Sequence, residues 1–403
     1  MAVTPPIPDT DYAALFRTYI QRSVQFALAD ARATGPALPV DERDQALHTL
    51  QYALATASAW EDARELLKVI APKLEQAGYR EGFIPYLQQG IAQCAANGEL
   101  AHQAELEQHL GSLLMVMARM EDARRAFTDS AQHAAAARDA HGEAAALNRW
   151  AYLDYLQQHY ADAEERLTAA GRLTDAGDSE VCYTAFVRGM MAMAQRDWNA
   201  AETHLRAALA GWQRHGDPVR IARSLTNLAN ALRGAGQVVE ALELYQQAIA
   251  QMHNLGDTAN EAATRMNLGN AYNELGQPQQ ALVHYRLAEP VFRLTRDHLR
   301  LARVQLNMGI AQSRLAEWDQ AQELLTSAVE FYRKLGDARG TANALDALAE
   351  VLLAQGQWAA TLAATEQAWQ ELGNQHTQPG LAPLLADIEK HRAAARQGLA
   401  DAG

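Results

Sequence analysis

Small apolar residues recur along the chain at a nearly fixed interval and open a repeated pattern. An alanine returns every 40 residues, with one interval of 38, at Ala123, Ala163, Ala201, Ala241, Ala281 and Ala321. A large apolar residue follows four positions later each time, at Phe127, Leu167, Leu205, Tyr245, Tyr285 and Leu325. A small residue follows seven positions after the alanine, as at Ala208 and Ala288. These spacings place all three on one face of an α-helix. The pattern predicts a helix whose small–large–small stripe packs closely against a neighbour.

A second helical run precedes each of these helices. In residues 262–276, Leu268, Gly269 and Tyr272 fall on one face of the predicted helix. A Gly-Gln pair at 236, 276 and 356 ends this first helix, because glycine favours helix ends. A Gly-Asp pair at 177, 216, 256 and 336 ends the second helix, and Arg138-Asp139 and Arg296-Asp297 occupy the same register without the glycine. The aspartate is expected to cap the helix that follows. The repeating unit is therefore a helical hairpin of 40 residues.

Hairpins of this length must stack to bury their apolar faces, and no segment shows the alternation of a strand. We therefore predict an all-α, right-handed superhelical solenoid of antiparallel helix hairpins, with no strands. Residues 1–100 form its irregular N-terminal part, with helices at 11–33 and near 41–58, 60–77 and 80–96. Residues 101–373 hold about seven repeats, and residues 381–400 form a C-terminal capping helix, all in one continuous solenoid. Pro290 lies inside a second helix, and we predict a break near 286–290.

The residues of this pattern resemble the tetratricopeptide repeat family in its 40-residue variant. Leu268-Gly269, Tyr272, Ala281, Tyr285 and Ala288 fall on the signature positions of that family, and Gly-Asp replaces its usual proline. The longer repeat is similar to those of the spindle-orientation scaffold LGN and of kinesin light chains. The N-terminal part resembles the sensor repeats of bacterial signal-transducing ATPases with NB-ARC-type modules. The chain has no GxxxxGK[ST] phosphate loop, so the likeness implies a sensor or scaffold without its ATPase.

Composition and charge restrict the functions of such an array. The net charge of −13 argues against nucleic acid and anionic membrane as partners. No apolar run approaches the roughly 20 residues of a membrane span, and no signal peptide is visible. Cys94 and Cys182 are too few for a disulfide framework, which favours the cytoplasm. No HExxH, GxSxG, CxxC or nucleotide-binding motif occurs, so we expect neither catalysis nor a cofactor or metal.

The resemblance implies that the first helix of each hairpin lines a concave groove that binds a protein or peptide. Transferring the groove positions of the family gives an aromatic and methionine patch at Tyr183, Phe186, Met190 and Met193. Polar groove positions follow at Arg223, Asn227, Asn230, Arg233, Asn267, Asn270, Asn273, Arg303, Asn307 and Arg314. Arginines suit carboxylates, and an apolar anchor of the partner suits the methionine patch. The partner segment is expected to be extended or helical, with acidic and apolar anchor residues.

Two questions stay open at this point. Asn227, Asn267 and Asn307 share one register, where an amide can bind a peptide backbone or instead join neighbouring hairpins. The aromatic and methionine patch can likewise belong to the groove or to the core between repeats. The leading hypothesis for function is a non-catalytic protein- or peptide-binding scaffold. The alternative is a ligand-sensing regulatory module of a bacterial signalling system that acts with a separate ATPase, protease or transcription factor.

Overall fold

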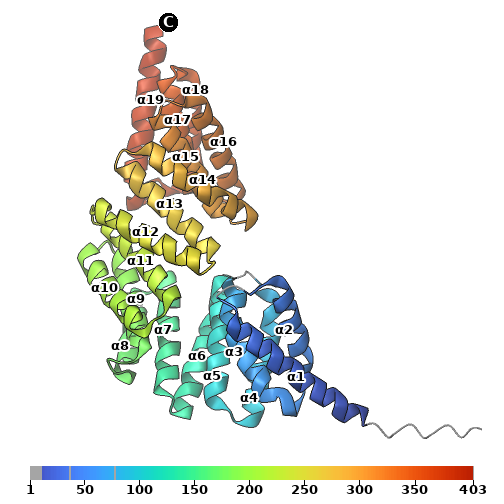
Figure 1. Ribbon diagram of the computed structural model, residues 1–403. Helices are drawn as coiled ribbons and strands as arrows, with labels where there is room; N and C mark the ends of the chain where they lie inside the picture. The colour runs from blue at the N-terminus through green and yellow to red at the C-terminus, as the bar shows by residue number, and fades with distance from the viewer. Residues whose placement is uncertain (1–10, 36–37, 77–78, 403) are drawn as a thin grey trace, which may run out of the picture. The chain divides into compact units, whose positions relative to one another are not determined.

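The computed structural model describes residues 11–35, 38–76 and 79–402 of the chain. These residues form helices without any β-strand (Figure 1), which confirms the all-α prediction. The α-helices are α1 (Tyr12–Ala33), α2 (Val40–Ala53), α3 (Trp60–Gln76), α4 (Ile84–Asn97), α5 (Leu100–Val116), α6 (Met120–Ala137), α7 (Ala140–Leu156), α8 (Tyr160–Leu173), α9 (Ser179–Ala194), α10 (Trp198–His215), α11 (Pro218–Gly234), α12 (Val238–Asn254), α13 (Thr258–Glu274), α14 (Pro278–Leu294), α15 (His298–Arg314), α16 (Trp318–Lys334), α17 (Ala338–Ala354), α18 (Trp358–Leu372) and α19 (Ala382–Ala402). Short 3-10 turns lie at η1 (Ala57–Ala59), η2 (Glu81–Phe83), η3 (Gly373–Thr377) and η4 (Pro379–Leu381).

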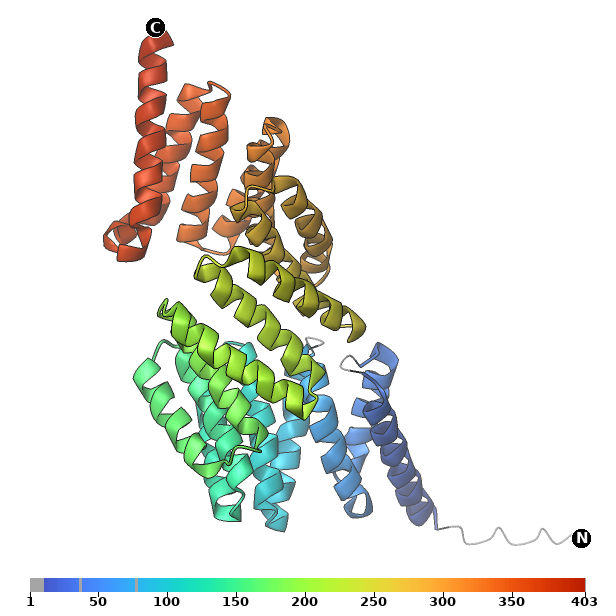
Figure 2. The same cartoon turned by 60° about the vertical axis from the view of Figure 1, so that its left-hand side comes forward.

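The chain divides into two compact units, Met1–Ser224 and Leu225–Gly403. Within each unit, consecutive helices pack side by side as hairpins, as both views show (Figures 1 and 2). The hairpins are α5–α6, α7–α8 and α9–α10 in the first unit and α13–α14, α15–α16 and α17–α18 in the second. We call the earlier member of each hairpin its first helix and the later member its second helix, and we use the same terms for α11 and α12, which occupy these positions of the repeat. The predicted repeating unit is therefore present in both units.

The small–large–small stripe of the second helices is buried as predicted. The marker alanines, such as Ala201 and Ala281, have no exposed surface, and neither do the large residues four positions later, such as Leu205 and Tyr285. Glycines on the first helices make room for these large side chains. A β-carbon on Gly189 would lie 2.6 Å from Cγ of Leu205, which is well inside van der Waals contact. In this hairpin the stripe therefore holds the two helices at a separation that suits glycine, whereas Ala151 and Ala229 occupy the equivalent position before Leu167 and Tyr245.

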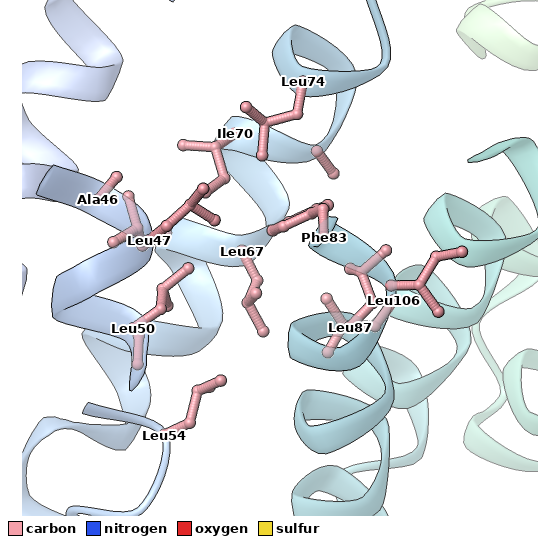
Figure 3. Close-up of a cluster of buried hydrophobic side chains, with 14 of the residues drawn as sticks. Ala46, Leu47, Leu50, Leu54, Leu67, Ile70, Leu74, Phe83, Leu87 and Leu106 are labelled. Atoms are coloured by element: carbon pink, nitrogen blue, oxygen red, sulfur yellow. The ribbon is translucent and has the colours of Figure 1, made fainter. Parts of the chain in front are cut away.

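The N-terminal helices have a leucine-rich core of their own. Leu47 and Leu50 of α2 meet Leu67 and Ile70 of α3 in a cluster that α4 and α5 extend (Figure 3). Phe83, just before α4, is fully buried in this cluster. Predicted helices at 11–33 and near 41–58, 60–77 and 80–96 correspond to α1, α2, α3 and α4, although a 3-10 turn replaces the end of the second one.

Aspartates cap the first helices as the Gly-Asp pattern predicted. The Oδ1 atoms of Asp139, Asp297 and Asp337 accept backbone N–H groups three residues later, at 2.9, 3.0 and 2.8 Å. The preceding residue takes a left-handed backbone conformation, with φ of 68° at Gly336. Arg296, which occupies the glycine position before Asp297, adopts the same conformation with φ of 56°. The turn geometry is thus kept where the glycine is absent.

The predicted break near Pro290 is wrong. α14 runs without interruption from Pro278 to Leu294, with Pro290 inside it. Proline removes one backbone N–H and crowds the carbonyl four residues earlier, here that of Arg286. Pro290 and Arg286 are both exposed. Water can therefore bind that carbonyl, and the helix tolerates the missing hydrogen bond on its solvent side.

The last helix covers the end of the second unit. α19 packs against α17 and α18, and Ile388 is fully buried there (Figures 1 and 2). The predicted capping helix at 381–400 is thus a helix at Ala382–Ala402. A polar contact adds to the apolar one, because Nδ1 of His391 lies 2.9 Å from Oδ1 of Asp346 on α17. The cap thereby covers Asp346, which is buried on α17.

Candidate peptide-binding faces

The residues of the predicted groove lie on first helices in both units. Tyr183, Phe186, Met190 and Met193 are half-buried on α9, and Arg223 is exposed on α11. The others belong to the second unit: Asn227, Asn230 and Arg233 on α11, Asn267, Asn270 and Asn273 on α13, and Arg303, Asn307 and Arg314 on α15.

The aromatic part of the patch in the first unit belongs partly to the core between repeats. The rings of Tyr183 and Phe186 lie 6.0 Å apart, and both pack against a buried cluster that includes Trp212 of α10, the second helix of their own hairpin. The same rings contact a second buried cluster that includes Leu167. One part of each ring therefore stabilises the repeat stack, and the remaining exposed part faces solvent. Met190 and Met193 follow one and two turns later on the same helix, both half-buried.

Two arginines surround the ring of Tyr183. The guanidinium carbon of Arg149, on α7, lies 3.9 Å from the ring centroid, and that of Arg220, on α11, lies 5.6 Å from it. Arg220 also lies 4.4 Å from the ring centroid of Trp212. These distances are those of cation–π contacts. Three successive first helices thus bring two positive charges to one aromatic side chain.

A buried carboxylate holds Arg149 in this position. Oε2 of Glu180 accepts hydrogen bonds from Nη1 of Arg149 at 2.5 Å and from Nδ2 of Asn148 at 2.9 Å. The Glu180 side chain is only 4% exposed. Burial alone would raise the pKa of Glu180, but the charge and hydrogen bond of Arg149 outweigh it and lower this pKa. The hydroxyl of Thr184 donates to Oδ1 of Asn148 at 2.8 Å and fixes the amide.

The remaining charges on this face are less evenly matched. Nε of Arg220 lies 3.3 Å from Oδ2 of Asp217, and both side chains are about one-third exposed. Burial lowers the pKa of Arg220, and the positive charge of Arg149 lowers it further. Burial raises the pKa of Glu75, on α3, and this effect exceeds the lowering by the positive charges of Arg223 and Arg149. The face therefore combines two mutually repelling guanidinium groups with carboxylates at their edges.

In the second unit, several predicted groove residues join neighbouring repeats. Oδ1 of Asn270 accepts hydrogen bonds from the hydroxyl of Tyr285 and from Nδ2 of Asn307, both at 2.8 Å. The hydroxyl of Tyr245 donates to Oδ1 of Asn230 at 2.6 Å in the same way. Burial raises the pKa of Tyr245 to about 12, so the hydroxyl is a reliable donor. These amides therefore fix first helices to each other and to the second helices.

Further groove positions are used in contacts between first helices. Nη1 of Arg233 donates to Oε1 of Glu274 at 2.5 Å, and Arg314 donates to the backbone carbonyl of Asn273. Asn273 itself is buried, and its Nδ2 lies 3.5 Å from the Tyr285 hydroxyl. Arg233, Asn273 and Arg314 therefore have structural partners inside the second unit.

Asn267 and Arg303 differ from these neighbours. Across residues 11–35, 38–76 and 79–402, the side chains of both lack hydrogen-bond and ion-pair partners. Asn267 is half-buried on α13, and Arg303 is exposed on α15. Arg303 lies one helical turn before Asn307, which is the residue in register with Asn267. An amide and a guanidinium thus remain available on adjacent first helices.

Histidine, cysteine and carboxylate side chains are distributed over the described part of the chain. No group of three or more His, Cys, Asp or Glu side chains is placed there to hold a metal ion. Cys94 and Cys182 are buried, and burial raises the pKa of the Cys94 thiol to about 12, which makes it a poor nucleophile. No helix among the described residues is long and apolar enough to cross a membrane.

The sequence pattern did not indicate three important residues of the first-unit face, namely Arg149, Glu180 and Arg220. The groove positions of the family, extended one repeat further towards the N-terminus, would have reached Arg149 on α7. Glu180 and Arg220 lie near the starts of α9 and α11 and carry no such signal. Their contacts with Arg149 and Tyr183 link residues more than 30 positions apart.

Solved structures with similar folds include a sensor and an enzyme. A Signal Transduction ATPase with Numerous Domains (STAND) protein with a tetratricopeptide repeat sensor, from Pyrococcus horikoshii, matches 94% of this chain with a TM-score of 0.68 and 14% identity. This chain spans 55% of that protein. Aspartyl phosphate phosphatase F from Bacillus subtilis matches 93% of this chain and 97% of its own, with a TM-score of 0.53 and 12% identity. At these identities the likeness shows the fold alone.

A third similar structure is shorter. The repeats of a candidate kinesin light chain from Podosopora anserina match 50% of this chain and 98% of their own, with 20% identity and a TM-score of 0.44. A search of the curated proteins finds no match.

The sequence model of the tetratricopeptide repeat family matches in four overlapping stretches, residues 183–252, 220–293, 260–334 and 300–368. The first stretch begins inside α9, and the later ones begin near the starts of α11, α13 and α15, so each follows the hairpins of the structure. The chain therefore carries tetratricopeptide repeats, which occupy residues 183–368.

Proposed function

We propose that this chain is a non-catalytic scaffold that binds an extended or helical protein segment along the first-helix face of its second unit. One observation carries the proposal. Asn267 and Arg303 have no hydrogen-bond or ion-pair partner for their side chains among the described residues, while the surrounding groove residues Asn230, Asn270 and Asn307 are engaged. The hydrogen bonds of the engaged residues hold this face rigid. A rigid face loses less conformational entropy when a partner binds.

The two available side chains suggest the chemistry of the partner. An amide offers a donor and an acceptor together, as a peptide backbone requires. A guanidinium offers a fork of donors that matches a carboxylate. We therefore expect a partner segment with exposed backbone near Asn267 and an acidic side chain near Arg303. A cytoplasmic location belongs to the proposal, because the two buried cysteines form no disulfide.

Affinity purification from the native host, followed by mass spectrometry, tests the proposal. The wild-type chain is compared with Asn267→Ala and Arg303→Glu, and each variant is first shown to melt like the wild type. Arg286→Glu is the matched control, because Arg286 is an exposed arginine on the second helix α14 of the same unit. The proposal predicts a protein that the wild type and the control retain and both groove variants lose. Equal recovery with all four chains would exclude this face as the binding site.

A ligand-sensing regulatory module is a second proposal, favoured by the likeness to the tetratricopeptide sensor of the STAND protein over 94% of this chain. Such a module would act with a separate ATPase, protease or transcription factor, and a peptide or small molecule would change its curvature. Small-angle scattering of the full chain with a co-purified ligand would then show altered dimensions. Unchanged scattering with that ligand bound would favour the static scaffold.

A further inference from the structure

The first unit holds a polar arrangement that the scaffold proposal does not use. Arg149, Tyr183 and Arg220 come from the neighbouring first helices α7, α9 and α11. The ring of Tyr183 lies 3.9 Å from the guanidinium carbon of Arg149 and 5.6 Å from that of Arg220. Stacking on the ring limits the motion of both guanidinium groups, so their remaining donors are held in place before any ligand arrives.

Most of these donors have no protein acceptor. Arg149 uses Nη1 for Glu180, with a weaker contact of 3.5 Å to the carbonyl of Ala145. In the described part of the chain, Nε and Nη2 of Arg149 and both Nη atoms of Arg220 donate to no protein group. The Arg149 side chain is 13% exposed and the Arg220 side chain 33% exposed. Water reaches both groups, and a small acceptor from a partner can replace it.

Charge favours an anion at this point. The guanidinium charge of Arg149 lowers the pKa of Arg220, after the larger effect of burial, which shows that the two cations repel each other. Glu180 neutralises Arg149 from the buried side, and Asp217 pairs with the other edge of Arg220. The charge of Glu180 also acts on Arg220, but the hydrogen bonds between Glu180 and an arginine go to Arg149. A negative group placed between them would relieve the repulsion and accept from both.

We propose that Arg149, Tyr183 and Arg220 form a binding site for a carboxylate of a peptide. The apolar surroundings favour a peptide over a free small acid. Phe186 and Ile221 lie half-buried beside the same cluster as Tyr183, and they can contact an apolar residue adjacent to the acid. The carboxylate can come from an Asp or Glu side chain or from a C-terminus. This site lies in the first unit and does not depend on the function proposed for the second.

Selection from a library of random dodecapeptides with free C-termini tests the site on the full chain. The proposal predicts that the wild-type chain enriches peptides with an Asp, Glu or C-terminal carboxylate next to an apolar residue. An enriched peptide is then synthesised with a free and with an amidated C-terminus, and calorimetry measures both affinities. Loss of affinity on amidation assigns the carboxylate to the C-terminus, and unchanged affinity assigns it to a side chain. Enriched peptides without a common acid, or no enrichment, would overturn the proposal.

Matched variants separate this site from a general effect of charge. Arg220→Gln is expected to lower the affinity for the enriched peptide about tenfold or more, since one charge-assisted hydrogen bond is lost. Arg149→Lys keeps the charge that Glu180 needs, but it loses the fork and the stacking, and it should weaken binding similarly. Arg172→Gln removes an exposed arginine of α8 in the same unit and should leave the affinity unchanged. Equal affinities for Arg220→Gln and Arg172→Gln would refute the site.

Discussion

Gly269 of α13 lies so close to Tyr285 of α14 that a β-carbon on the glycine would stand 2.4 Å from Cε1 of the ring. Tyr285 is completely buried and its hydroxyl is bonded to Asn270, so the ring cannot move aside freely. The same arrangement joins Gly111 to Phe127 and Gly309 to Leu325. In these three hairpins the close approach of the two helices therefore depends on a glycine that faces the large residue of the stripe, whereas Ala229 takes that position before Tyr245.

Gly269→Ala is therefore expected to lower the free energy of unfolding. Overpacking of a rigid core costs about 1–3 kcal/mol, which exceeds the gain of about 1 kcal/mol in helix propensity. Thermal melting followed by circular dichroism measures the effect. Gly171→Ala is the control, because a β-carbon on Gly171 of α8 meets no atom within 4 Å. This second variant should melt at or above the wild-type temperature, and equal changes in both variants would contradict the packing argument.

Arg296→Gly should stabilise the second unit. Arg296 has a φ of 56°, a left-handed conformation that costs an L-residue about 1 kcal/mol relative to glycine. Its exposed side chain makes no hydrogen bond or ion pair with the described residues that would be lost. Denaturant unfolding should show a gain of about 1 kcal/mol. The reverse change, Gly256→Arg, occupies the equivalent turn with φ of 67° and should show a loss of similar size. A loss in both variants would show that the side chain of Arg296 has a role of its own.

Pro290→Ala should also stabilise the chain. Alanine restores the backbone N–H to the carbonyl of Arg286 inside α14, and proline in a helix interior costs about 3 kcal/mol. Removal of the proline also makes the unfolded state more flexible, which offsets part of this stabilisation. We therefore expect the free energy of unfolding, measured with denaturant, to rise by about 1–3 kcal/mol. Pro278→Ala is the control, since Pro278 stands at the first position of the same helix, where proline is favourable. A gain at Pro278 and none at Pro290 would contradict the explanation given for the unbroken helix.

Docking of the C-terminal helix should depend on pH through His391. The hydrogen bond with Asp346 raises the pKa of His391, more than burial and Lys390 lower it, and Glu350 adds to the increase. A raised pKa in the folded state means that the stabilisation is complete below the unfolded value near 6.5. It is lost as the pH rises through the folded value.

Melting of the wild type and of His391→Gln at about pH 6 and about pH 8 measures this effect. The melting temperature of the wild type should exceed that of the variant by more at the lower pH, because only the histidinium form is stabilised by Asp346. A constant difference across this range would indicate that His391 stays neutral in its contact with Asp346.

The regular part of the fold could be predicted from the sequence because the stripe repeats. Ala281, Tyr285 and Ala288 on one helix face specify burial without reference to any distant residue. The contacts of Asp346 could not be predicted in this way, since its partner His391 lies outside the repeats, on the capping helix. Asn307 and Asn267 share one register, yet of these two side chains it is Asn307 that donates a hydrogen bond to Asn270. Side-chain reach between particular helices decides such differences, and the repeat spacing does not record it.

The ion pair of Arg149 and Glu180 should be essential to the first unit. Their side chains are 13% and 4% exposed, and Nη1 lies 2.5 Å from Oε2. Glu180→Gln leaves a mostly buried guanidinium without its counter-charge, which we expect to cost about 3 kcal/mol in denaturant unfolding near neutral pH. Glu164→Gln is the control. Glu164 pairs with Arg188 at the surface, where its side chain is 47% exposed, and its loss should change stability by about 0.5 kcal/mol or less.

The pH dependence of this difference tests the cause. Arg149 and its hydrogen bond lower the pKa of Glu180 against the opposing effect of burial. A lowered folded pKa means that the stabilisation is present above the unfolded value of about 4.5 and is lost as the pH falls through the folded value. The difference in the free energy of unfolding between the wild type and Glu180→Gln should therefore stay constant from neutral pH down to about 5. It should close in stronger acid, because a protonated Glu180 resembles glutamine. A gap that persists there would show that Glu180 acts through its shape and hydrogen bonds with Asn148 and not through its charge.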